Sequence, residues 1–229
     1  MANKQETRAK ARPGPQAKKQ AQPERGKMPI LGIILGIAAV LLLVAVMVSD
    51  TGSEPLGGDE FGEPVITGTA LAANIGSNPV DASDDPAFGV VIPEIDGTDF
   101  AGNSVSITND GQPKAILFVS HSCPHCRDEV TEVQSWLDST GGVDGVQLVT
   151  VSTAASSAAS NWPPSEWLER AEWTAPVIAD DPDSSTFRAF GGSAIPYWVF
   201  VDAEGAVTRR NVGRMDIRAA EAAMLELVP

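Results

Sequence analysis

Short apolar runs alternate with amphipathic stretches along the C-terminal part of the chain, from about residue 86 onward. Apolar runs bounded by turn residues are typical of buried strands, and apolar residues at helical spacing are typical of helices with one buried face. We therefore expect an α/β domain over residues 86–229, in which helices flank a central mixed β-sheet. The pattern predicts strands at 115–119, 146–151, 175–179, 197–201 and 206–209, with a hairpin turn at 202–205. It predicts helices just after residue 123, at 164–170 with Ser165 as the cap, near 184–190 and at 216–228.

A much longer apolar run, Pro29–Val48, lies near the N-terminus and holds twenty residues without a charged or strongly polar side chain. As a helix it would measure roughly 30 Å, the thickness of the hydrocarbon core of a membrane. The run therefore predicts a single transmembrane helix at 29–48. A cleaved signal peptide is the alternative, but the run exceeds the roughly 7–15 apolar residues of a signal peptide, and no clear Ala-x-Ala cleavage site follows it.

The distribution of charge predicts the orientation of this helix. Residues 1–28 carry eight Lys or Arg and two Glu, with three prolines and few apolar residues, so we expect a disordered basic tail. Basic flanks stay in the cytoplasm, which would place the tail inside the cell and the C-terminal domain outside it. Residues 49–229 hold 28 acidic and 8 basic side chains, and this net negative charge disfavours binding to nucleic acid.

Residues 49–85 lie between the predicted membrane helix and the predicted domain. They are rich in Gly, Ser, Asp and Pro and show little periodicity, so we interpret them as a flexible extracytoplasmic spacer. Within it, residues 64–71 could form a short strand against the edge of the domain. The expected order is a tail at 1–28, a membrane helix at 29–48, a spacer at 49–85 and an α/β domain at 86–229.

The two cysteines of the chain are three positions apart, at Cys123 and Cys126. A disulfide that closes so short a loop stabilises a fold very little, so a structural role is disfavoured. Cys123 is predicted at the end of a strand and the start of a helix, where free backbone N–H groups favour a thiolate. Pro124 suits the first helical turn, and Cys126 can act as the resolving thiol. His125 adds positive charge beside the sulfur, which favours oxidising potentials.

The same residues could instead bind a metal. His121 and His125 are the only histidines in the chain, and together with the two cysteines they would supply four ligands for zinc or copper. All four would have to converge from six consecutive residues, which strains a tetrahedral site. The metal interpretation is therefore the weaker one, and disulfide exchange itself needs no cofactor.

A strand, a C-x-x-C motif at a helix N-terminus and a later Ile195-Pro196 before an aromatic strand together resemble the thioredoxin superfamily over residues 86–229. The resemblance implies that Pro196 is cis and packs against the disulfide. It also implies that Ile195 offers backbone hydrogen bonds to the substrate. The alternative for Pro196 is an ordinary proline at the start of a strand.

Within that superfamily the chain looks like the membrane-anchored TlpA/ResA-like, or redoxin-type, group. The resemblance rests on the anchor, on the Cys123-x-x-Cys126-x-x-Glu129 pattern and on the 70-residue step from Cys126 to Pro196. It implies that Glu129 influences the thiols, whereas the alternative is a solvated helix carboxylate. Ser122 and Thr131 depart from the Trp and Pro of that group. The Pro-His dipeptide is more typical of DsbA-type oxidases, which leaves the direction of electron flow open.

These observations predict a membrane-anchored, extracytoplasmic thiol–disulfide oxidoreductase that exchanges disulfides with exported proteins. A redox partner would have to recycle its cysteines. A DsbA-like thiol oxidase and a non-catalytic copper or zinc carrier remain as alternatives. A peroxidase of the peroxiredoxin type is disfavoured, because the Pro-x-x-x-Thr-x-x-Cys pattern of that family does not surround Cys123.

Overall fold

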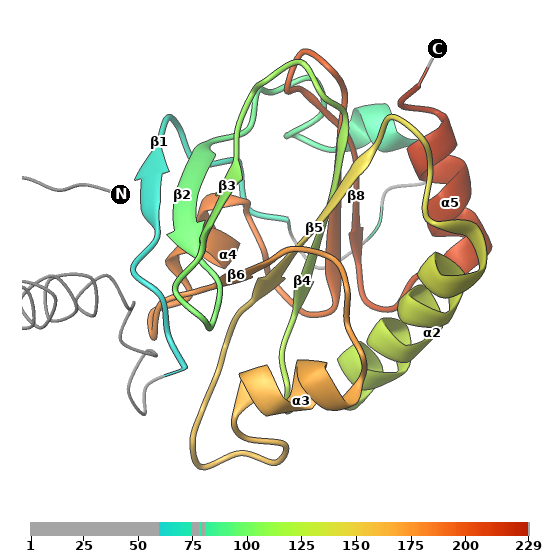
Figure 1. Ribbon diagram of the computed structural model, residues 1–229. Coiled ribbons are helices and arrows are strands. Elements are labelled where there is room, and N and C mark those ends of the chain that lie inside the picture. Colours follow the sequence, from blue (N-terminus) through green and yellow to red (C-terminus); the bar gives the residue numbers. More distant parts are fainter. Residues whose placement is uncertain (1–59, 75–77, 79–80, 229) are drawn as a thin grey trace, which may run out of the picture. The chain divides into compact units, whose positions relative to one another are not determined.

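The computed structural model describes residues 60–74, 78 and 81–228 (Figure 1). The predicted tail, the predicted membrane helix at 29–48 and the first part of the predicted spacer lie outside these residues. Within the described ranges, every helix is too short or too polar to cross a membrane.

A five-stranded mixed sheet forms the centre of the part of the chain that the structure describes. Its strand order is β6-β5-β4-β7-β8, in which β4–β5 and β5–β6 are parallel and β4–β7 and β7–β8 are antiparallel. Every residue of β4 and of β7 is buried, because these strands lie in the middle of the sheet and are covered on both faces. The strands are β4 (Lys114–Val119), β5 (Gln147–Ser152), β6 (Val177–Ala179), β7 (Tyr197–Val201) and β8 (Val207–Val212).

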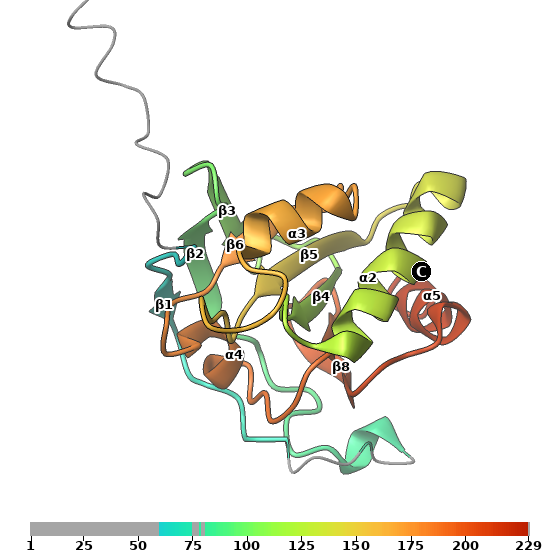
Figure 2. The ribbon, with the colours of Figure 1, turned by 90° about the horizontal axis from the view of Figure 1, so that it is seen from below.

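Alternate residues of β4 point into two separate cores. Ala115 and Leu117 pack against one layer of helices, whereas Ile116 and Phe118 pack against the opposite layer. The first layer holds α2 (Pro124–Thr140), α3 (Pro164–Arg170) and α5 (Ile217–Leu225), and the second holds α4 (Ser185–Ala189) together with a smaller sheet (Figure 2). The predicted α/β architecture is thus confirmed.

The smaller sheet is antiparallel, with the order β1-β2-β3. Its strands are β1 (Val65–Thr67), β2 (Glu94–Thr98) and β3 (Ser104–Ile107), and a short 3-10 helix, η2 (Ala82–Asp84), lies between β1 and β2. The short strand expected within residues 64–71 is β1. The β2–β3 hairpin was not predicted. Ile95 and Ile107 bury its inner face, and the Asp99 carboxylate accepts hydrogen bonds from the turn amides of Ala101 and Asn103.

The described part of residues 49–85 differs from the predicted spacer, because it packs against the domain. Leu71 is 5% exposed, and its N–H donates to the Ala189 carbonyl at 2.8 Å. The N–H of Asn74 donates to the Gly191 carbonyl at 2.7 Å. The buried side chain of Asp85 pairs with Arg210 of β8. The folded unit therefore begins before residue 86, since residues 60–74 bring apolar side chains and free backbone groups that the domain satisfies.

Two local predictions are corrected. Pro163, and not Ser165, is the N-cap of α3, and no side-chain hydrogen bond caps this helix. Because the helix begins two residues earlier than a Ser165 cap would require, Ser165 lies inside the first turn, where its N–H donates to the Glu60 carboxylate at 3.0 Å. The predicted strand at 175–179 is shortened to β6, because Pro176 has no N–H to donate to a ladder.

Candidate active site

Cys123 is the N-cap residue of α2, directly after the loop that follows β4. Its Sγ accepts a hydrogen bond from the Cys126 backbone N–H at 3.3 Å, and its own N–H donates to the Ser120 carbonyl at 3.1 Å. Pro124 occupies the first helical turn, where its missing N–H has no cost. The Cys123 sulfur therefore takes the place of a capping oxygen, and a thiolate there would complement the positive end of the helix.

The two sulfurs differ strongly in exposure. Cys123 is partly exposed, whereas Cys126 is 0% exposed and lies in the core shared by the sheet and α2. Burial raises the pKa of the Cys126 thiol far above its ordinary value, and its hydrogen bond to the Cys123 sulfur raises it further. Cys126 is thus held as a protonated thiol, and Cys123 is the sulfur that an incoming group can reach.

The Ile195–Pro196 segment lies just before β7 and also approaches the Cys123 sulfur. The peptide bond between these residues is cis, as the resemblance implied. The Ile195 carbonyl oxygen lies 3.7 Å from the Cys123 Sγ, although the two residues are 72 positions apart. Pro196 is buried and Ile195 is half-buried, so the backbone of Ile195 stands beside the more accessible sulfur.

Glu129 lies on the buried side of α2, one turn after Cys126, and is 1% exposed. The alternative of a solvated helix carboxylate is wrong. The Oε1 atom of Glu129 accepts a hydrogen bond from Trp198 Nε1 at 2.6 Å. The backbone nitrogen of Met215 lies 3.2 Å from Oε1 and 3.1 Å from Oε2. Burial raises the pKa of Glu129 to about 7, although these hydrogen bonds oppose the shift.

The two histidines lie in different environments. His125 is exposed on the first turn of α2. His121 is 0% exposed, and both of its ring nitrogens are occupied: Nε2 accepts from the Ser156 N–H at 3.1 Å, and Nδ1 lies 2.8 Å from the Ser160 carbonyl oxygen. Among the residues that the structure describes, no three His, Cys, Asp or Glu side chains are grouped as metal ligands. The four-ligand arrangement of the metal alternative is not formed.

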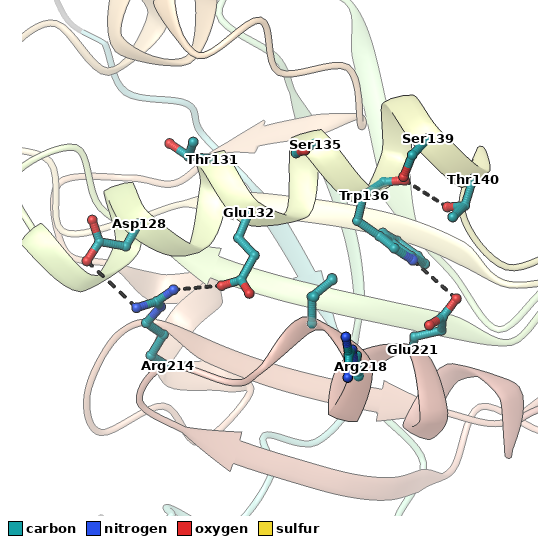
Figure 3. A pocket seen from close by; sticks show the side chains of 11 residues that line it. Asp128, Thr131, Glu132, Ser135, Trp136, Ser139, Thr140, Arg214, Arg218 and Glu221 are labelled. Carbon is teal, nitrogen blue, oxygen red and sulfur yellow. Dashed lines mark hydrogen bonds and ion pairs between the residues drawn. The ribbon is translucent and has the colours of Figure 1, made fainter.

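A groove of about 690 Å³ runs between α2 and α5, and it contains neither cysteine (Figure 3). Arg214 crosses one end, where it pairs with Glu132 at 2.6 Å and with Asp128 at 3.9 Å. Trp136 Nε1 donates to Glu221 at 3.2 Å further along. Because Cys123 does not line this groove, the candidate site is defined by the contacts of Cys123 and not by a cavity.

Sequence reasoning did not identify three residues of this arrangement: Trp198 and Met215 as partners of Glu129, and His121 as the residue that holds the 154–161 loop. Trp198 lies two positions after Pro196 on β7, so a β-strand reading could have placed it on the same side of the sheet as the helix. Nothing in the local pattern points to Met215 or to the contacts of His121.

The chain is similar in sequence to a known protein family and to a characterised protein. The family profile described as the AhpC/TSA family matches residues 88–210. Sporulation thiol-disulfide oxidoreductase A of Bacillus subtilis (strain 168) is 25% identical over 114 residues, which are 50% of this chain and 67% of that protein.

Two solved structures show the same fold. The thioredoxin domain of a thiol-disulfide oxidoreductase from Bacteroides vulgatus has a TM-score of 0.51 and 21% identity, over 62% of this chain and 99% of that one. A thiol:disulfide interchange protein of the thioredoxin family from Chlorobium tepidum TLS has a TM-score of 0.50 and 20% identity, over 60% of this chain and 94% of that one. Because the family profile spans more than half of the chain and the fold agrees with it, the chain belongs to the AhpC/TSA family and has a thioredoxin-like fold.

Proposed function

We propose that this thiol–disulfide oxidoreductase is anchored in the cell membrane through residues 29–48 and exchanges disulfides with exported proteins through Cys123 and Cys126. The observation that carries the proposal is the unequal exposure of the two sulfurs. Cys123 caps a helix and is accessible, whereas Cys126 is buried one turn behind it. A two-step exchange needs this arrangement, since the exposed sulfur must form the mixed disulfide with the partner before the buried sulfur attacks and resolves it.

In the reducing direction, the Cys123 thiolate attacks one sulfur of the partner's disulfide. That S–S bond breaks, a mixed disulfide forms, and the partner's other sulfur leaves and takes a proton. Cys126 then loses its proton and attacks the Cys123 sulfur, so the bond to the partner breaks and the partner's second thiol is released. Two electrons pass to the partner, whose disulfide becomes two thiols, and a second redox protein must then supply two electrons to reduce the Cys123–Cys126 disulfide. The oxidising direction reverses these steps.

The surrounding residues fit separate roles in this exchange. Glu129, whose pKa is raised to about 7 by burial, is suited to take up the proton that Cys126 releases and to return it at neutral pH. Ile195 offers backbone hydrogen bonds to an extended partner segment, and Pro196 packs beside the sulfurs. His125 is exposed on the first turn of α2, next to Cys126, and Pro124 would fix that turn.

The direction of exchange depends on the reduction potential of the cysteine pair. The Pro-His dipeptide favours an oxidant, with thioredoxin near −270 mV and DsbA near −120 mV as the approximate limits. Equilibration of the purified protein with glutathione buffers gives this potential. A value close to the DsbA limit assigns a thiol oxidase, and a value close to the thioredoxin limit assigns a reductase.

Replacement of the resolving thiol tests the proposal. Without Cys126 the mixed disulfide on Cys123 cannot be resolved, so Cys126→Ala should accumulate covalent adducts with exported proteins. Dithiothreitol should cleave these adducts by reducing the mixed disulfide. Non-reducing gels followed by mass spectrometry detect them. Cys123→Ala is the matched control and should form no such adduct. If Cys126→Ala captures no partner while it remains folded, disulfide exchange is not the function of this site.

A further inference from the structure

His121 stands two residues before Cys123 and joins that segment to the loop at residues 154–161, which connects β5 to α3. The ring contacts both ends of a short stretch of this loop, through the Ser156 N–H and the Ser160 carbonyl. The His121 carbonyl in turn accepts from Asn161 Nδ2 at 3.0 Å. The indole ring of Trp162 lies edge-on to the imidazole, with 5.8 Å between the ring centres.

These partners select one form of the imidazole. A backbone N–H can only donate, so the Nε2 atom that faces Ser156 carries no proton. A carbonyl oxygen can only accept, so the Nδ1 atom that faces Ser160 carries the proton. The ring is therefore the neutral Nδ1–H tautomer. An added proton on Nε2 would set two donors against each other.

Few other contacts hold this loop. At its start the Ala154 carbonyl accepts a hydrogen bond from the Ser120 hydroxyl at 3.2 Å, and the Ala154 N–H donates to the Ser184 hydroxyl at 3.3 Å. Residues 154–160 are all Ala or Ser, so their side chains bury little area. Within this stretch one backbone hydrogen bond, from Ala159 N–H to the Ser156 carbonyl, is formed. Ala154 and Asn161 at its two ends adopt positive φ angles of 48° and 62°, which cost free energy for residues other than glycine. The contacts of His121 offset this cost.

We propose that His121 is a positioning residue for disulfide exchange, which fixes the 154–161 loop as a surface that contacts the partner polypeptide beside Cys123. This inference rests on the proposed function. The small side chains of the loop let the backbone of an extended partner segment approach closely, in the same way that Ile195 offers its backbone on the cis-proline side. The expected partner is thus a polypeptide whose disulfide lies in an extended, accessible segment.

The test compares a large and a small disulfide. Reduced protein is mixed with insulin, which would contact the loop, and with oxidised glutathione, which would reach only the sulfur. His121→Ala removes two hydrogen bonds that fix the loop, and it should slow the reaction with insulin about tenfold or more. The rate with glutathione and the equilibrium constant of the cysteine pair should change less than about twofold, because the loop contacts neither sulfur.

Three further variants separate loop fixation from general damage. His121→Asn can still donate to Ser160 and His121→Gln can still accept from Ser156, so each should recover part of the rate with insulin even if His121→Ala unfolds. Glu169→Gln, at an exposed position on α3 outside this loop, is the matched control and should react like the wild type. Nitrogen NMR of the wild type should show the Nδ1–H tautomer of His121.

The outcomes also separate this inference from the proposed function. If the wild type reacts with neither disulfide, the proposed function fails. If the wild type reacts with both and the His121 variants match it, or slow both reactions equally, His121 has no role in partner contact. An Nε2–H tautomer in the wild type would also overturn the inference.

Discussion

At the scale of single residues, the exposure of the side chain differs sharply between residues in the first turns of α2. Cys123 and Cys126 differ in exposure because one caps α2 and the other points into the core beneath it. Glu129 follows one turn later and shares that core. The negative charge of Glu129 contributes to the raised pKa of the Cys126 thiol, so the two groups are coupled and the proton state of one affects the other.

The raised pKa of Glu129 predicts that folding stability depends on pH. Between about pH 4.5 and pH 7 the unfolded chain loses the Glu129 proton while the folded protein keeps it, so stability is present at low pH and is lost as the pH rises toward 7. The loss should approach about 3 kcal/mol at pH 8. Glu129→Gln has no such proton and still offers an oxygen to Trp198, so the difference in unfolding free energy between wild type and variant should shift by this amount.

Urea unfolding of the reduced proteins at pH 4.5 and pH 8 measures this difference. Glu169→Gln, at an exposed position on α3, is the control, and its difference from the wild type should vary little between these two pH values. A difference for Glu129→Gln that is the same at both pH values would mean that folding does not raise the pKa of Glu129.

Much of the site is readable from sequence because its residues are local. The motif at 123–126 lies between a strand and a helix, and both elements have clear apolar patterns, so the position of Cys123 at the helix start could be predicted. The burial of Glu129 could not, because the carboxylate is held by Trp198 and Met215, which arrive from β7 and from the segment before α5. Such contacts depend on packing between distant segments, which local periodicity does not record.

At the scale of elements, a buried ion pair joins the segment between β1 and β2 to the central sheet. Arg210 on β8 is 3% exposed, and its guanidinium makes a two-point contact with the Asp85 carboxylate. The same guanidinium donates to the Ala72 carbonyl at 2.8 Å and to the Phe190 carbonyl at 3.4 Å. Residues on both sides of η2 are therefore tied to β8 and to the end of α4 through one side chain.

Removal of one partner of this pair should destabilise the protein strongly. Arg210→Met leaves Asp85 buried without its counter-charge and should cost about 3–5 kcal/mol in unfolding free energy. Addition of Asp85→Asn should recover part of that loss, because no charge then remains buried. Arg209→Met is the matched control: Arg209 is half-exposed and pairs with Glu226 at 3.6 Å, so its loss should cost less than about 1 kcal/mol.

Urea titrations of the four proteins measure these values. Equal costs for Arg210→Met and Arg209→Met would contradict a stabilising role for the buried pair.

Most strands of the large sheet and most helices could be located from sequence because they carry an apolar run or a helical stripe, and the start of β8 was located from the hairpin turn at 202–205. The β2–β3 hairpin could not, since its strands contain Glu, Asp, Gly and Ser and bury few side chains, chiefly Ile95 and Ile107. The turn between them, with Asp99 and Asn103 around Gly102, was the one available signal. The extent of β1 likewise depends on its pairing with β2.

At the scale of the whole molecule, charge and hydrophobicity are segregated along the chain. The predicted tail is basic, the predicted membrane helix is apolar, and residues 49–229 are strongly acidic. The acidic part should be repelled by anionic lipid headgroups, so any attachment to a membrane must come from the N-terminal segments.

Co-flotation with vesicles of phosphatidylcholine and phosphatidylglycerol tests this expectation. The full chain, reconstituted from detergent, should float with the vesicles and resist extraction at alkaline pH. A protein of residues 60–229 should stay in the soluble fraction. Ile37→Arg/Leu42→Arg places two charges in the apolar run, at about 2.5–3.5 kcal/mol each, and should be extracted. Extraction of the unmodified full chain would contradict the predicted membrane helix.

The contact of Glu60 with α3 has a mechanical consequence. The carboxylate of Glu60 holds the Ser165 N–H, and Phe61 lies 6.1 Å from the ring of Trp162, which itself touches His121. A pull on the chain ahead of residue 60 would therefore load this line of side chains before it strained the central sheet. If residues 29–48 anchor the chain as proposed, tension on the segment before residue 60 would act first on the loop that His121 holds.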